Sequence, residues 1–406
     1  MSTDPVAHSK DNSRLLKDAG VAVALLLALG IVFVWDRTRP TPSTETSKGV
    51  TIVTPKEDDK PTLPSAPAVR LRIGVIQGEF DEMGKLLKSL GEGYQFTKVE
   101  LDELINPETY DKYDFLLVTC GGYTNTWLGE SKGTESRGQG LFAAKPEIWD
   151  KVGGYLRAFV KRGGTLYASD LRFSLIALTF DEFVDQGRAD EGQQQTVIAE
   201  VTDPGLRELL GQTIPLKFDQ PDWRPAAFKG DTVVTYLNGR YKSKSDRDRE
   251  SPLLVKFPFG DGAVIFTSFH NEKQNSDVEV KLLKYLVFAT VTAQTEAKIT
   301  KKMLEGGFSP SGSNLLSASA ENPSVTRKWH CTKKGAVQFV LGFQNNSGAK
   351  LKLTVVGPNG QRAEKEGTST LEIDLPEAVP GEWSYTVTAL QVPYANFPFT
   401  LTIGEK

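Results

Sequence analysis

Three short groups of chemically capable residues each follow a run of apolar residues typical of a buried strand. They are Cys120-Gly121-Gly122, Asp170-Leu171-Arg172 and His270-Asn271-Glu272. In open α/β sheets, ligand sites lie beyond the carboxyl ends of the strands. A carboxylate, an imidazole and backbone amides that meet there suit a small anionic or sugar-like ligand, or a metal held by carboxylate and imidazole. The candidate catalytic residues are therefore Asp170, His270 and Glu272, and the candidate ligand-binding residues are Gly121, Gly122, Asp170 and His270.

Each of these residues also has a purely structural explanation. Cys120 is a small residue that suits a buried strand end. Asp170 could accept hydrogen bonds from the free amides of a helix that begins near Arg172. His270 could bond to a neighbouring loop. Both interpretations stay open at the level of sequence, and the surroundings of the Asp170 carboxylate distinguish them.

The elements that must position these residues are predicted over 69–297, where buried-type strands alternate with helices. Such alternation favours a mostly parallel sheet with helices on both faces. We expect an antiparallel addition at one edge near 232–237. The other strands are expected at 71–76, 98–101, 113–119, 165–169 and 263–269, and the helices at 82–90, 148–162 and 278–289.

Three segments of this region resemble the class I glutamine amidotransferase-like fold, a flavodoxin-like α/β fold that includes the ThuA-like proteins. The segments are Y-D-F-L-L-V-T-C-G-G, R-G-G-T-L-Y-A-S-D and F-T-S-F-H-N-E. In that family a Gly-Gly after the third strand supplies oxyanion-hole amides, and Gly121-Gly122 match it. A His with a Glu two residues further on matches His270 and Glu272. The family's nucleophilic Cys stands on a tight elbow, and Asp170 takes that position here.

The change at the elbow bears directly on activity. Amide hydrolysis needs a thiolate or an activated hydroxyl, and a carboxylate is a poor nucleophile towards an amide. Cys120 lies in the oxyanion-loop position and cannot simply replace the missing thiol. We therefore expect no amidotransferase activity and no cofactor. A His-rich metal site is excluded, because His270 is the only one of three histidines that lies in the α/β region, and we expect no metal.

The C-terminal part has a different pattern. Short alternating runs separated by turn residues over 309–406 predict an all-β sandwich. The segment P-G-E-W-S-Y-T-V within it resembles strands of fibronectin-type or immunoglobulin-type modules. Between the two patterns, 298–308 ends in Gly306-Gly307 and is expected to be a hinge.

The N-terminal part predicts a membrane anchor. After a tail over 1–18, the segment 19–35 contains 17 uncharged residues, close to the lower limit for a spanning helix. A buried core helix is one alternative, and a cleaved signal peptide is another, although bulky and charged residues follow the apolar run. Basic residues flank both sides, so orientation rests on the short leading tail, which favours an N-terminus inside. The Pro-, Thr- and Ser-rich segment 36–68 is expected to be a disordered linker.

These features lead to two hypotheses about function. A net charge of −3 and a pI near 5.9 give no general case for nucleic-acid binding. We expect a single-pass protein of a bacterial inner membrane with its body outside the cytoplasm. The first hypothesis is a non-catalytic binding or scaffold protein with protein partners in an envelope assembly. The alternative is a ThuA-like enzyme or ligand-binding protein that acts on a small polar or carbohydrate substrate.

Overall fold

The computed structural model describes residues 71–128, 145–185, 190–225, 227–274, 276–318, 322–345 and 347–406. The expected tail, membrane segment and linker therefore lie outside the described residues. Among the residues that are described, no helix is long and apolar enough to cross a membrane.

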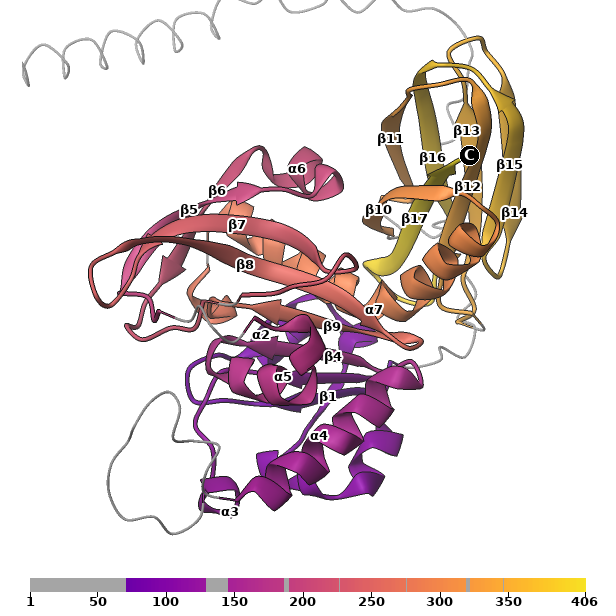
Figure 1. The fold of residues 1–406 in the computed structure, drawn as a ribbon. Coiled ribbons are helices and arrows are strands. Elements are labelled where there is room, and N and C mark those ends of the chain that lie inside the picture. Colours follow the sequence, from indigo (N-terminus) through magenta and orange to yellow (C-terminus); the bar gives the residue numbers. More distant parts are fainter. Residues whose placement is uncertain are drawn as a thin grey trace, which may run out of the picture. The chain divides into compact units, whose positions relative to one another are not determined.

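A nine-stranded sheet forms the frame of the first part of the chain, and five of its strands are parallel (Figure 1). β1, β3, β4 and β9 are buried along their whole lengths, as the apolar runs predict. The parallel strands, in spatial order, are β2 (Phe96–Lys98), β1 (Ile73–Ile76), β3 (Phe115–Val118), β4 (Thr165–Ser169) and β9 (Gly262–Thr267).

Four antiparallel strands continue the sheet beyond β9. The predicted edge strand near 232–237 is present as β7, but it belongs to a larger addition. Buried and exposed residues alternate along β5 and β6, which is the period of strands with one covered face. In spatial order these strands are β8 (Asp248–Phe259), β7 (Val234–Lys242), β5 (Gln195–Val201) and β6 (Thr213–Phe218).

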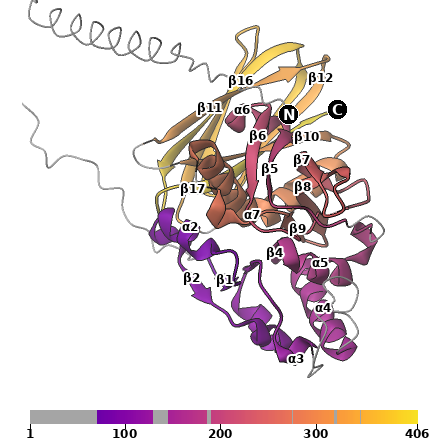
Figure 2. The ribbon, with the colours of Figure 1, turned by 90° about the vertical axis from the view of Figure 1, so that its left-hand side faces the viewer.

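Helices cover both faces of the parallel strands (Figures 1 and 2). Within β3, Leu116 joins the core under α4 (Pro146–Lys161) and α5 (Phe173–Thr179). Leu117 joins the core that includes α2 (Met83–Ser89) and α7 (Asp277–Glu305). This alternation follows from the two-residue period of a strand. The remaining short helices are α3 (Asn125–Leu128) and α6 (Pro204–Leu210).

Two sequence-based boundaries are corrected. The strand expected at 98–101 lies earlier, at 96–98, and Leu101–Ile105 form a 3₁₀ helix. The expected hinge at 298–308 is helical as far as Glu305, because α7 continues well beyond the predicted end at 289. Ile299 and Met303 on these last turns pack with Val340. The contact that extends the helix is therefore tertiary, and the α/β part and the C-terminal part belong to one compact unit.

The C-terminal part consists of two four-stranded antiparallel sheets that share one hydrophobic core. The alternating runs 337–341, 351–355, 370–374, 383–387 and 399–403 correspond to β12, β13, β15, β16 and β17. The strands β10, β11 and β14 were not predicted. The first sheet is β10 (Ser309–Ala318), β17 (Phe397–Glu405), β12 (Gly335–Phe343) and β15 (Leu371–Ala378). The second is β11 (Ser324–Cys331), β16 (Gly381–Gln391), β13 (Lys350–Val356) and β14 (Arg362–Gly367).

Candidate functional site

Asp170 stands on a sharp turn between β4 and α5. β4 ends at Ser169, and Asp170 begins the 3₁₀ turn Asp170–Arg172 that leads into the helix. Its φ angle is +43°, and only 3 % of the residue is exposed. Positive φ is uncommon outside glycine, although Asp tolerates it better than most residues. The chain therefore adopts a strand–turn–helix elbow with a buried carboxylate at its tip.

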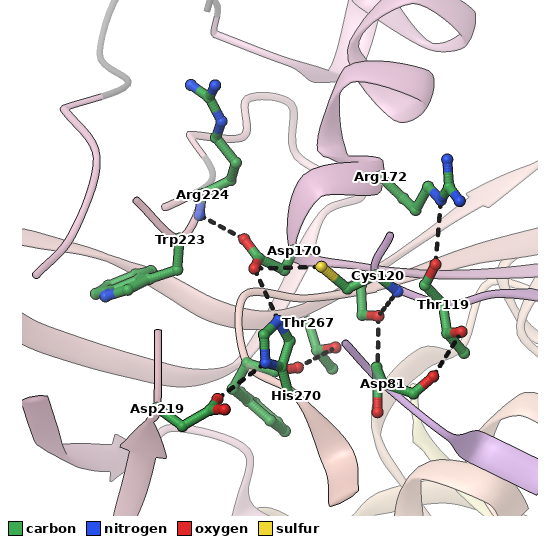
Figure 3. Close-up of polar contacts among 12 residues, drawn as sticks. Asp81, Thr119, Cys120, Asp170, Arg172, Asp219, Trp223, Arg224, Thr267 and His270 are labelled. Carbon is green, nitrogen blue, oxygen red and sulfur yellow. Dashed lines mark hydrogen bonds and ion pairs between the residues drawn. The ribbon is translucent and has the colours of Figure 1, made fainter. Parts of the chain in front are cut away.

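The Asp170 carboxylate is surrounded by groups from other parts of the sheet (Figure 3). Its Oδ2 lies 3.0 Å from His270 Nε2, and the Cys120 thiol donates to the same oxygen at 3.5 Å. Its Oδ1 accepts a hydrogen bond of 2.6 Å from the backbone N–H of Arg224. None of these described partners is an amide of α5, so the expectation that Asp170 caps its own helix is wrong. The carboxylate joins three loops instead.

His270 lies between two carboxylates. Its Nδ1 is 2.9 Å from Asp219 Oδ1, and its ring stacks on Phe80 with 6.3 Å between ring centroids. Burial alone would lower the pKa of the imidazole, but Asp170, Asp81 and Asp219 together raise it to about 9. At neutral pH the ring therefore carries a proton on both nitrogens and donates to both Asp170 and Asp219.

Cys120 is fully buried at the end of β3, as its structural explanation predicts. Burial, followed by the nearby charge of Asp170, raises the pKa of its thiol far above the usual value. The backbone N–H of Cys120 donates to Ser169 Oγ at 2.9 Å, which ties the ends of β3 and β4 together. The thiol is thus neutral at physiological pH, and a neutral thiol is a poor nucleophile.

The two candidate glycines have different surroundings. A Cβ atom at Gly121 would lie 2.8 Å from both Gly78 Cα and the backbone nitrogen of Glu79. Gly121 therefore allows the loops after β1 and β3 to approach each other. A Cβ at Gly122 would meet nothing within 4 Å. Glu272 has its backbone in the 3₁₀ turn Asn271–Lys273, and its side chain is outside the described part of the structure.

Asp81 is a site residue that the sequence analysis missed. It lies in the loop after β1 and is almost completely buried. Its carboxylate accepts hydrogen bonds from Ser169 Oγ at 2.9 Å, from the backbone N–H of Asn271 at 2.9 Å and from Asn271 Nδ2 at 3.0 Å. The rule that directed attention to the ends of β3, β4 and β9 applies equally to β1, so this signal was present in the sequence.

Asp219 and Arg224 were also missed, for a different reason. Both follow β6, which lies at the far edge of the sheet order. The loop after β6 returns across the strand ends and brings one carboxylate and one backbone N–H to the elbow (Figure 3). No local motif marks either residue, because their role depends on a return path that only the fold reveals.

The arrangement concentrates acidic groups around one imidazole, and Asp81 and Asp170 are buried while Asp219 is partly exposed. Asp81, Asp170 and Asp219 contribute three carboxylates, and His270 bonds two of them directly. Both oxygens of Asp170 already have partners within the protein. A buried carboxylate whose two oxygens are engaged within the protein is poorly placed for nucleophilic attack, which needs an accessible lone pair.

Comparisons with known proteins give only distant similarities. No family model matches the sequence, and no curated protein matches it. A protein described as a GMP synthase subunit from Thermoplasma acidophilum is 12 % identical, with 58 % of this chain and 98 % of that chain covered and a TM-score of 0.35. A glutamine amidotransferase from Thermotoga maritima is 13 % identical, with 58 % and 94 % covered and a TM-score of 0.31.

A third solved structure is similarly distant. The pre-peptidase C-terminal domain of a collagenase from Bacillus anthracis is 13 % identical, with 23 % of this chain and 88 % of that chain covered and a TM-score of 0.18. The described residues form a mixed sheet with helices on both faces of its parallel strands, followed by a β-rich region. What the site can do follows from its own side chains.

Proposed function

We propose that this chain is a membrane-anchored, non-catalytic binding or scaffold protein of an envelope assembly. Its α/β domain is amidotransferase-like but degenerate, and its C-terminal part is a sandwich of fibronectin or immunoglobulin type. One observation carries the non-catalytic part of the proposal. The residue at the elbow is Asp170, and its carboxylate is held by His270, Cys120 and the N–H of Arg224.

The energetics of this carboxylate support a structural role. Asp170 is only 3 % exposed. A carboxylate buried to this extent stays charged only when partners compensate for its lost hydration. His270 supplies the opposite charge, and the Arg224 N–H supplies a further donor. A substrate that reached Asp170 would have to displace these partners. The buried carboxylate and its partners therefore have a structural role, because they join the ends of four strands.

The membrane and partner parts of the proposal rest on the sequence. The uncharged segment 19–35 suits a spanning helix, and the Pro-rich segment 36–68 suits a tether between the anchor and the body. Extraction of cell membranes at alkaline pH tests the anchor. The full chain is expected in the membrane pellet, and a variant without 19–35 in the soluble fraction. Release of the full chain at alkaline pH would contradict an anchor.

The non-catalytic part is tested with the full chain in detergent. Ammonia release from glutamine is expected to equal the rate without protein, both for the natural chain and for Asp170→Asn. Turnover by the natural chain that Asp170→Asn removes would overturn this part. The scaffold part predicts that in-cell crosslinking recovers the same envelope protein from independent preparations, and that removing 19–35 reduces its recovery.

A second candidate function is supported by the strained geometry of the elbow. Non-glycine residues with positive φ and buried charged groups beside an imidazole are concentrated at functional sites. Asp170 and His270 combine both features. A ThuA-like enzyme or ligand-binding protein for a small polar or carbohydrate substrate would lose its activity in His270→Ala with little change in Tm. If that substitution lowers the Tm and changes no activity, the structural role is favoured.

A further inference from the structure

Three different metal-binding side chains converge at the elbow. Cys120 Sγ, Asp170 Oδ2 and His270 Nε2 all lie within 4.8 Å of one another, and all three residues are buried. They come from the ends of the neighbouring strands β3, β4 and β9 (Figure 3). The sequence predicted no metal because it offers one histidine here. The fold adds a thiol and a carboxylate, which together make a set of ligands.

The spacing of these atoms suits a tetrahedral ion. Ligand atoms at the usual zinc distances from one tetrahedral centre are about 3.3–3.8 Å apart. The observed separations are 3.5 Å from Cys120 Sγ to Asp170 Oδ2 and 3.0 Å from His270 Nε2 to the same oxygen. The third pair, Cys120 Sγ and His270 Nε2, lies within 4.8 Å. Side-chain shifts of at most about 1 Å would therefore bring all three pairs to tetrahedral spacing.

A second and independent observation concerns the atoms on the far sides of these ligands. Asp219 Oδ1 lies 2.9 Å from His270 Nδ1, so a carboxylate holds the ring with Nε2 towards the other two candidate ligand atoms. The Arg224 N–H occupies Asp170 Oδ1 and leaves Oδ2 directed towards Nε2 and Sγ. Histidines that bind metals usually donate their second ring N–H to a carboxylate in this way.

We propose that Cys120, Asp170 and His270 bind one Zn²⁺ ion, with Asp219 as a positioning residue. A thiolate, an imidazole and a carboxylate form a ligand set that suits zinc. The fourth position is left to water or a small ligand, as in zinc sites with three protein ligands. Binding replaces the proton on Nε2 and the thiol proton, and both protons pass to solvent. The ion also offsets part of the negative charge of Asp81, Asp170 and Asp219.

This site goes beyond the proposed function and does not depend on it, because its test measures metal rather than turnover or partner binding. The full chain is purified in detergent without a polyhistidine tag, treated with a chelator and titrated with Co²⁺. We expect one ion per chain, a thiolate-to-cobalt charge-transfer band in the near ultraviolet and the strong visible bands of tetrahedral Co²⁺. Zn²⁺ is expected to displace Co²⁺ and to raise the Tm.

The variants separate this site from other metal binding. Cys120→Ala is expected to lose the charge-transfer band, whereas Cys331→Ala, which changes the other buried cysteine, keeps it. Asp219→Asn keeps the three ligands and the band, and its affinity is expected to fall about 10–100-fold. Circular dichroism without metal checks that each variant is folded. If Cys120→Ala does not fold, Cys120→Ser takes its place beside Asp219→Asn.

Several results would overturn the proposal. One is a folded natural chain that binds no Co²⁺, or that binds Co²⁺ without a charge-transfer band. Another is a band that persists in the cysteine variants at position 120 or disappears in Cys331→Ala. An unchanged affinity in Asp219→Asn would remove the positioning role of that carboxylate. None of these results would restore or remove glutamine turnover, so the two proposals fail separately.

Discussion

His270 Nε2 lies 3.0 Å from Asp170 Oδ2, although the two residues are 100 positions apart in the chain. The contact joins the end of β4 to the end of β9, which are neighbours in the sheet. Because Asp170 has φ +43°, its side chain is held at the tip of the elbow, within reach of the imidazole. The elbow therefore presents a charge partner to His270.

Replacing Asp170 tests how much this contact contributes to the free energy of unfolding. Asp170→Ala leaves the imidazolium buried with one carboxylate fewer, and we expect a loss of about 3–5 kcal/mol in the free energy of unfolding. Asp246→Ala is the matched control, because Asp246 also has positive φ, +57°, and is exposed. Both variants share the backbone strain of Ala at positive φ. Urea unfolding with a chelator present measures both, and equal losses would contradict a special role for the Asp170 carboxylate.

The Gly-Gly pair after β3 provides a second test. Gly121→Ala places a Cβ 2.8 Å from Gly78 Cα, so we expect a loss of about 1–3 kcal/mol from overpacking. Gly122→Ala projects into open space and is expected to change the stability by less than about 0.5 kcal/mol. Thermal unfolding of the two variants checks this difference. A larger loss in Gly122→Ala would contradict the close approach of the loops after β1 and β3 at Gly121.

A buried ion pair between β8 and α7 gives a third prediction. Lys256 Nζ lies 2.5 Å from Glu296 Oε2, and the side chains are 10 % and 13 % exposed. Lys256→Met leaves the glutamate without its partner, and we expect a loss of about 3–5 kcal/mol. The double variant with Glu296→Leu removes both charges and should recover most of this loss. A double-mutant cycle in urea measures the coupling, and additive losses would show that the pair contributes nothing.

A fourth prediction concerns the pH dependence of stability at Asp203. This residue caps α6 by accepting from the Leu206 N–H at 2.7 Å. Burial is the largest influence and raises the pKa of its carboxyl group; Glu296 also raises it, while the Leu206 amide and Lys256 lower it. The carboxyl group of Asp203 therefore binds its proton more tightly in the folded state than in the unfolded state. Its protonation stabilises the fold, and this contribution is fully present at pH values below the pKa of the unfolded state. It is lost as pH rises through the folded pKa.

The variant Asp203→Asn keeps a capping oxygen and removes this titration. Its stability relative to the natural chain is therefore expected to increase as pH rises from about 3 to about 6. Urea unfolding at the two pH values measures the change. Asp185→Asn, on another loop, serves as a comparison for the removal of one acidic group. A relative stability that falls over this range would mean that the carboxylate is stabilised, rather than penalised, by its surroundings.

The sequence by itself determined the alternation of strands and helices, because that pattern is local. Apolar runs such as Phe115–Val118 favour burial on both faces. Chain order then placed Cys120, Asp170 and His270 at strand ends, and parallel strands have their carboxyl ends at one edge. The approach of Asp170 and His270 to each other was thus expected without coordinates, whereas Cys120 was interpreted only as a buried residue at a strand end.

Only the tertiary structure decided the partners of these residues. Asp219 and Arg224 reach the elbow from a loop after the far edge strand, and Asp81 bonds to Asn271 across 190 positions. The last turns of α7 are helical where a hinge was expected, because Ile299 and Met303 are covered by Val340. Burial and the choice of hydrogen-bond partner are properties of the assembled chain. The state of a carboxylate such as Asp170 depends on both, so its role became visible only when the distant loops were in place.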